Sequence, residues 1–224
     1  MLSDKTDENT AYGRRISLKA LATEKTRAAI IEAATVEFAD KGLAGARVDE
    51  IGRQTETSKH MLYYHFGNKD GLYQAVLEHA YANLRLAQEQ IDYDALDPVN
   101  ALESLVALSF NSHVNNPAYV RLIVAENVNC GVHIRHIRNI ETRRAVLDLL
   151  RKIISRGAAQ GIFRGDIDPL HLHMTISALS FTFVANRYTF GHIFGVDMTD
   201  PDLIAERRKH IVDAVLRICV SHDH

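Results

Sequence analysis

Apolar side chains recur every three or four residues along most of the chain, a spacing that places them on one face of a helix. One such row, which includes a polar Asn, consists of Leu172, Ile176, Leu179, Phe183, Asn186 and Phe190. Another consists of Ile211, Val215 and Cys219, with Val212, Leu216 and Val220 beside it. No segment of useful length alternates apolar and polar residues as a half-buried strand does. The pattern predicts an all-α protein of about nine helices.

The four prolines predict where helices begin. Each follows an Asp or Asn, in the pairs Asp97-Pro98, Asn116-Pro117, Asp168-Pro169 and Asp200-Pro201. An Asp or Asn side chain can accept a hydrogen bond from an unpaired N–H of the first turn, and proline suits the next position because the N–H it lacks has no partner there. Gly131 and Gly161 lie where helices begun near Pro117 and near Arg138 would end.

The first 22 residues are polar and rich in basic side chains. Positions 12–27 contain five basic residues and one acidic residue, a balance that favours a solvated tail unless a DNA-reading element follows it. We expect a flexible arm over 1–22, a DNA-binding domain over 23–70, and a ligand-binding and dimerisation domain over 71–224. The arm residues that could reach DNA are Arg14, Arg15 and Lys19.

Composition indicates a globular protein, with 46% hydrophobic and 24% charged residues. The first ten residues have no apolar segment typical of a signal peptide, and the longest nearly apolar run, 174–185, is shorter than the roughly 20 residues of a membrane span. Cys130 and Cys219 are isolated, which argues against a disulfide framework. We therefore expect a cytoplasmic protein without a membrane partner.

The region 24–70 has the pattern of a helix-turn-helix. A helix over about 24–41 is expected to bury Ile30, Ala34 and Phe38 and to end at Gly42. Two short helices over 48–54 and 58–64 follow, and a further helix begins after Asn68, with Asp70 in its first turn.

The second short helix is the expected recognition helix, which in such proteins lies in the DNA major groove. Val48, Ile51 and Leu62 can face inward, and Ser58 can cap the helix. The outer side then displays Lys59, His60, Met61, Tyr63 and Tyr64, with Arg47 and Lys69 placed to contact phosphates.

This region resembles the tetracycline-repressor (TetR) family. The similarity runs from Thr26 to about Leu77 and is most specific in Leu62-Tyr63-Tyr64-His65-Phe66 followed by Asn68-Lys69. Beyond it the helical layout is similar, and the segment 153–169 resembles many members. The resemblance implies a dimeric transcriptional regulator that binds a double-stranded DNA operator, usually as a repressor that a small molecule releases.

The resemblance also implies roles for individual residues. Lys59, His60 and Met61 match positions that commonly contact bases. Tyr63, His65 and Lys69 match positions that commonly contact the DNA backbone. Tyr64 and Phe66 match positions that are often partly structural, and since aromatic residues at helical spacing usually fill a core, core packing is the simpler expectation for both.

The sequence departs from the family pattern in three ways. Glu56 stands where members usually have Gly, and a non-glycine residue there costs about 1 kcal/mol if the backbone is left-handed. Thr57 replaces a hydrophobic residue. Ala46-Arg47 replaces a Thr or Ser cap and adds a cation. These changes, with the added negative charge of Glu56, raise the alternative of a small-molecule-binding protein whose DNA-binding head is degenerate.

The resemblance implies a ligand pocket and a dimer interface in the remainder of the chain. Pocket candidates are polar or aromatic residues on otherwise apolar helices, namely His113, Tyr119, Glu126, Asn127, Phe183, Asn186 and Arg187. For each of them, a surface or interface role with satisfied hydrogen bonds is the simpler alternative. The helices that begin at Pro169 and Pro201 are expected to pair with their copies, although their apolar rows could also fill the monomer core.

Other chemistry finds little support in the sequence. His133 and His136 could share a helix face, but no Cys or acidic cluster completes a zinc site, so neither a metal nor a cofactor is expected. We find no Gly-rich phosphate loop, GxSxG or HExxH motif, and hence no indication of an enzyme.

Overall fold

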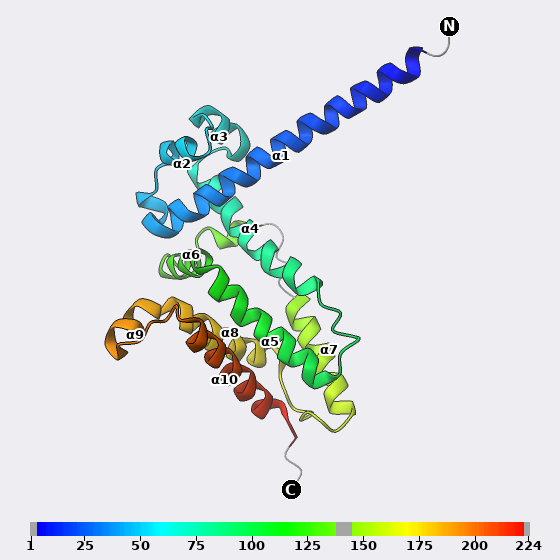
Figure 1. The fold of residues 1–224 in the computed structure, drawn as a ribbon, viewed down its shortest axis with the longest axis vertical. Helices are drawn as coiled ribbons and strands as arrows, with labels where there is room; N and C mark the ends of the chain where they lie inside the picture. The colour runs from blue at the N-terminus through cyan, green and yellow to red at the C-terminus, as the bar shows by residue number, and fades with distance from the viewer. Residues whose placement is uncertain (1–3, 138–144, 222–224) are drawn as a thin grey trace. The chain divides into compact units, whose positions relative to one another are not determined.

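The computed structural model is built from α-helices (Figure 1). It describes residues 4–137 and 145–221, with side chains from Thr23 onward except those of Leu84 and Arg85. Within these ranges the only β feature is an isolated bridge between Phe163 and Val220, which confirms the predicted all-α class. No described helix combines the length and the apolar character that a membrane span requires. The chain divides into two compact units, Met1–His79 and Ala80–His224, and the boundary lies within α4 (Lys69–Glu89).

Unit 1 contains α1 (Asp4–Gly45), α2 (Val48–Gln54), α3 (Lys59–Phe66) and the first part of α4. Ile30, Ala34 and Phe38 are buried, as predicted, on one face of α1. The Phe38 ring meets the edge of the buried Tyr73 ring of α4 at 5.1 Å between centroids. This apolar face supports the short helices of the unit.

The first helix begins earlier than the sequence pattern predicted. Its backbone is helical from Asp4, not from about residue 24, because residues 14–22 are mostly good helix formers and contain no proline. The side chains of Arg14, Arg15 and Lys19 lie outside the described residues. Gly42 adopts φ 66°, ψ 172°, so the regular helix is interrupted at the predicted position.

Unit 2 is arranged around α5 (Pro98–Asn115), which contacts four other helices (green in Figure 1). These are α6 (Pro117–Val128), α7 (Ala145–Ala159), α8 (Pro169–Ala185) and α10 (Pro201–Cys219). Leu102, Leu105 and Phe110 of α5 are fully buried in the core of this unit. A short 3-10 helix, η1 (Ile134–His136), follows α6. The predicted helix start near Arg138 lies outside the described residues.

All four Asp-Pro and Asn-Pro pairs mark helix starts, as predicted. The Asp97, Asp168 and Asp200 side chains each accept a hydrogen bond from a backbone N–H of the first turn. Asn116 differs, because its side-chain amide donates to the Ser112 carbonyl at the end of α5 instead of capping α6. The Asn116 side chain therefore bonds to the end of α5 and not to the start of α6.

The predicted single helix through Asn186 to Phe190 is broken. α8 ends at Ala185, Asn186 adopts φ −101°, ψ 8°, and a separate helix α9 (Arg187–Phe194) follows. The described residues therefore form ten α-helices where about nine were expected. Asn is a weak helix former because its side chain competes for backbone hydrogen bonds. Gly195, at φ 65°, then ends α9. Figure 1 shows α9 at the edge of unit 2, extending from the end of α8.

Candidate nucleic-acid interface and ligand cavity

The position of α3 is fixed at both ends and by one buried side chain. The Ser58 hydroxyl accepts a hydrogen bond of 3.2 Å from the Met61 N–H, which confirms the predicted cap. Gly67 ends the helix at φ 77°, a conformation that favours glycine. Leu62 is 1% exposed and anchors the inner side of α3.

The outer side of α3 is open to solvent. Lys59, His60, Met61, Tyr63 and Tyr64 are all exposed. Tyr64 is 74% exposed and does not fill the core, so the expectation that this residue packs in the core was wrong. An exposed aromatic and basic surface of this kind can contact both bases and phosphates.

Phe66 and His65 lie at the end of the helix and are half-buried. The guanidinium of Arg27 from α1 lies above the Phe66 ring, 5.4 Å from its centroid. This cation–π contact gives Phe66 a packing role within unit 1, in agreement with the structural expectation for that residue.

The turn between α2 and α3 is tight. A Cβ at Gly52 would lie 2.6 Å from the Thr57 carbonyl oxygen, and the Thr57 N–H donates to the Gly52 carbonyl at 2.9 Å. Glu56 adopts φ 52°, which is the left-handed conformation that favours glycine. For a residue with a Cβ this conformation costs about 1–2 kcal/mol.

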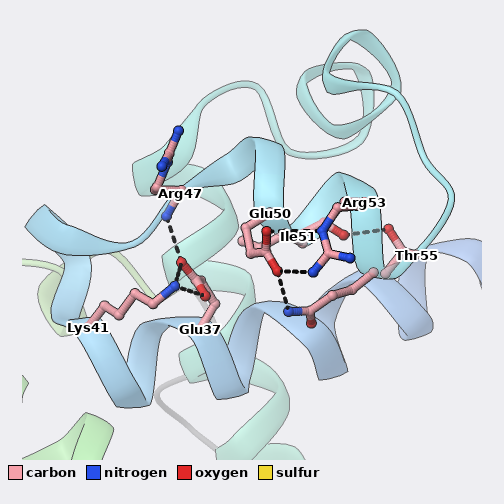
Figure 2. Close-up of polar contacts among 8 residues, drawn as sticks. Glu37, Lys41, Arg47, Glu50, Ile51, Arg53 and Thr55 are labelled. Carbon is pink, nitrogen blue, oxygen red and sulfur yellow. Dashed lines mark hydrogen bonds and ion pairs between the residues drawn. The ribbon is translucent and has the colours of Figure 1, made fainter.

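Glu37 holds the start of α2 against α1 (Figure 2). Its carboxylate accepts hydrogen bonds of 2.9 Å from the Arg47 N–H and from the Lys41 ammonium group, and it is 5% exposed. Burial raises the pKa of Glu37, but the hydrogen bonds from Lys41 and Arg47 outweigh burial and leave its pKa below the usual value. No pattern in the sequence indicates this role of Glu37, because its partner Arg47 lies ten residues away and bonds through its backbone N–H.

The predicted phosphate-binding cations have different surroundings. Arg47 is exposed and makes no side-chain cap for α2, as its replacement of a Thr or Ser predicted. The Lys69 ammonium group donates to the Ala44 carbonyl at 3.2 Å, so this side chain also joins the start of α4 to the end of α1. The Lys59 ammonium group lies 3.3 Å from the Asp49 carboxylate. Arg47 and Lys59 are thus both exposed cations, and the charge of Lys59 is paired with Asp49.

Unit 2 contains a cavity of about 370 Å³ between α5, α6 and α8, and Gln88 near the end of α4 also lines it. Each of α5, α6 and α8 contributes residues spaced four apart: Ser109 and His113 from α5, Tyr119, Ile123 and Asn127 from α6, and His173, Ser177 and Phe181 from α8. Three of the seven predicted pocket residues, His113, Tyr119 and Asn127, therefore line one cavity. The other lining residues were not predicted. On α5, α6 and α8 the spacing of four residues could have indicated most of them, because it places side chains on one helix face.

The remaining predicted pocket residues lie elsewhere. Glu126 is buried, but its carboxylate accepts hydrogen bonds from the N–H groups of His133 and Ile134 and so caps η1. Phe183 lines a second cavity, of about 430 Å³, between α8, α9 and α10. Asn186 ends α8, and the Arg187 guanidinium packs over the Tyr188 ring at 4.7 Å.

Family models match both units. Residues 30–76 match the model of bacterial regulatory proteins of the tetR family, and residues 98–215 match the C-terminal domain of tetracycline repressor-like proteins. The chain is also 33% identical over 205 residues to the HTH-type transcriptional repressor NicS of Pseudomonas putida, covering 91% of this chain and 97% of that protein.

The chain belongs to the TetR family. Solved structures share the fold. SCO4942 from Streptomyces coelicolor has a TM-score of 0.66 and 28% identity, covering 87% of this chain and 98% of that one. A tetR-family regulatory protein from Rhodococcus RHA1 has a TM-score of 0.69 and 23% identity, covering 89% and 99%. TetR-family proteins are dimeric DNA-binding regulators, so this chain is a transcriptional regulator and not an enzyme.

The Glu37 contact of this TetR-family chain predicts a pH-dependent loss of stability. Glu37→Gln removes the charge that pairs with Lys41 and weakens the bond from Arg47, so the free energy of unfolding should fall by about 1.5–3 kcal/mol at pH 7. Because the pKa of Glu37 is lowered on folding, the contribution of the carboxylate is complete above its ordinary pKa of 4.5 and is lost as the pH falls further. Urea unfolding at pH 7 and pH 4 should therefore show a smaller difference at pH 4.

Glu50→Gln is the matched control, since Glu50 pairs with the exposed Arg53 and with Gln54 on the surface of the same unit (Figure 2). It should cost less stability than Glu37→Gln. Equal losses for the two variants would contradict the role assigned to Glu37.

The left-handed turn predicts that Glu56→Gly stabilises the protein. Glycine adopts φ near 52° without steric cost, so the free energy of unfolding should rise by about 1 kcal/mol after the entropy gained by the unfolded chain is subtracted. Glu56→Gln keeps the Cβ and removes only the charge, and it should leave stability unchanged. If Gln stabilises as much as Gly in urea unfolding, the effect comes from charge and not from backbone strain.

Proposed function

We propose that this chain is a repressor that binds operator DNA with the exposed side of α3 and is released by a small molecule bound in unit 2. The observation that carries the proposal is the division of α3 into a buried side, with Leu62 at 1% exposure, and an open side with Lys59, His60 and Tyr63. Its relative in Pseudomonas putida is named a transcriptional repressor, which supports the same mode here.

The side chains of α3 divide by the contacts that their chemistry allows. His60 and Met61 lie in the first turn, the part of a recognition helix that meets base edges, and we assign them base contacts. Lys59 matches a position that commonly contacts bases, but its ammonium group, like the Tyr63 hydroxyl, suits phosphate oxygens. Ser58, Arg47, His65, Tyr64 and Lys69 are assigned to the border of the interface, and Arg14, Arg15 and Lys19 to contacts of the N-terminal segment.

We assign the dimer interface to α8 and α10, and we add α9 to it. Leu170 and Met174 form an exposed apolar row on α8, at 50% and 58% exposure. On α9, Tyr188, Ile193 and Phe194 are 66–69% exposed. Monomeric proteins rarely expose so many large apolar side chains together. A dimer of TetR-family chains provides the partner that would cover them.

The DNA assignment predicts a large loss of affinity when α3 loses its outer side chains. DNA that the full chain selects from a random library supplies the probe, since the operator is unidentified. Lys59→Ala with Tyr63→Ala should weaken binding to the selected DNA at least tenfold at about 0.15 M salt, because two phosphate contacts are lost. Lys69 is avoided because it also bonds to the Ala44 carbonyl.

Arg151→Ala is the control for this experiment, as it removes one exposed positive charge from α7 in unit 2. It should leave affinity within about twofold. If no sequence is enriched in the selection, the alternative of a ligand-binding protein with a degenerate head is favoured. If affinity survives loss of Lys59 and Tyr63, α3 is not the reading helix.

The dimer assignment predicts that charge on α9 weakens association. Ile193→Glu with Phe194→Glu places two carboxylates on the exposed apolar face and should shift the dimer toward monomer in sedimentation experiments. His192→Glu is the control within the same helix, because His192 is already an exposed polar residue. Unchanged association of the double variant would exclude α9 from the interface.

A further inference from the structure

The cavity between α5, α6 and α8 limits the kind of molecule that fits it, and this inference rests on the proposed function, in which that cavity holds the effector. Its volume of about 370 Å³ lies near the lower end of ligand pockets. The cavity therefore suits a compound of one or two rings. Its charge, hydrogen-bonding groups and aromatic walls narrow the class further.

The described residues that line the cavity include no Lys, Arg, Asp or Glu. The titratable groups among them are His113, Tyr119 and His173. Burial, with a smaller effect of His173, lowers the pKa of His113 to about 4, and burial also lowers the pKa of His173. Both imidazoles are therefore uncharged at neutral pH. A charged ligand would lose water without gaining a counter-charge, which is costly.

The polar side chains of the wall offer both donors and acceptors, and two of them use a donor within their own helix. The Ser109 hydroxyl donates its single proton to the Leu105 carbonyl at 2.9 Å, and the Asn127 amide nitrogen donates to the Ile123 carbonyl at 2.8 Å. The Ser109 oxygen is left as an acceptor, whereas the Asn127 amide keeps one N–H and its oxygen. A carboxylate on a ligand can only accept, so it finds no donor at Ser109.

His113 adds an unsatisfied atom at the same place. Its Nδ1 is buried and has no hydrogen-bond partner within the described structure, and the residue is 9% exposed. A buried polar atom without a partner costs about 1–3 kcal/mol. With the imidazole proton on Nε2, Nδ1 is an acceptor, so a ligand N–H or O–H group would satisfy it.

Aromatic rings form part of the wall. Phe181 meets the His113 ring edge-to-face, with centroids 5.6 Å apart, and Tyr119 meets Tyr81 in the same manner at 5.6 Å. Rings of this kind pack well against another planar ring. We propose that the cavity binds an uncharged aromatic molecule that donates hydrogen bonds, of the class of aromatic amides and phenols, and discriminates against aromatic carboxylates.

Matched amide and acid pairs test this proposal on the full chain. Benzamide and 2-naphthamide are compared with benzoate and 2-naphthoate by calorimetric titration at pH 7.5, where both acids are anions. Each amide should bind at least about tenfold more tightly than its acid. An acid that binds as tightly as its amide overturns the proposal, and so does the failure of both amides to saturate at millimolar concentration.

Two variants locate the binding. Ser109→Ala removes an acceptor, and His113→Leu removes the unpaired Nδ1, so each should weaken 2-naphthamide binding about fivefold or more. His113→Leu is expected to fold, because the atom it deletes has no partner to lose. His171→Leu is the control, since this exposed histidine of α8 does not line the cavity. Unchanged binding in both test variants overturns the assignment.

Failure of the proposed ligand class can be distinguished from failure of the proposed regulatory function. If the amides bind in this manner but DNA affinity is the same with and without them, the ligand class stands and effector control of DNA binding fails. If the acids bind better while DNA affinity responds to them, the regulator stands and the ligand class is wrong.

Discussion

The burial of Leu62 is the contact on which the DNA-binding surface depends. A helix of eight residues such as α3 is too short to persist in water alone. Leu62 fixes it against unit 1, and Gly52 allows the close approach, since a Cβ at Gly52 would lie 3.5 Å from the Leu62 side chain and 2.6 Å from the Thr57 carbonyl. With the inner side fixed by this contact, Lys59, His60, Met61, Tyr63 and Tyr64 are left exposed. The orientation of the interface thus follows from one apolar contact and one glycine.

Polar contacts in unit 1 then fix the ends of the short helices. Glu37 ties the start of α2 to α1, Ser58 caps α3, and Lys69 bonds to the end of the α1 helix. Glu56 works against this arrangement, because its backbone is held in a conformation that favours glycine. The turn is retained because the close packing of α2 and α3 requires it, so local strain is offset by burial elsewhere in the unit.

Sequence patterns predicted the features that depend on local chemistry. The Asp-Pro and Asn-Pro pairs marked four helix starts, and the spacing of Leu62 and its neighbours identified the buried side of α3. Contacts between distant residues were beyond such patterns. Glu126 was expected to face a ligand, but its carboxylate caps η1. The break at Asn186 depends on the backbone conformation of that residue after the end of α8. The cavity needed three helices to be placed together, although each carried its residues at a spacing of four.

The central claim is that α3 lies against DNA, and cross-linking measures this most directly. A photoreactive phenylalanine analogue at Tyr63 of α3 should form cross-links to DNA selected from a random library, at two positions about 10 base pairs or a multiple of that apart. The same analogue at Tyr188 of α9, an exposed tyrosine in unit 2, should give none. Cross-links from Tyr188 that equal those from Tyr63, or their absence from Tyr63 on DNA that is bound, would contradict the account.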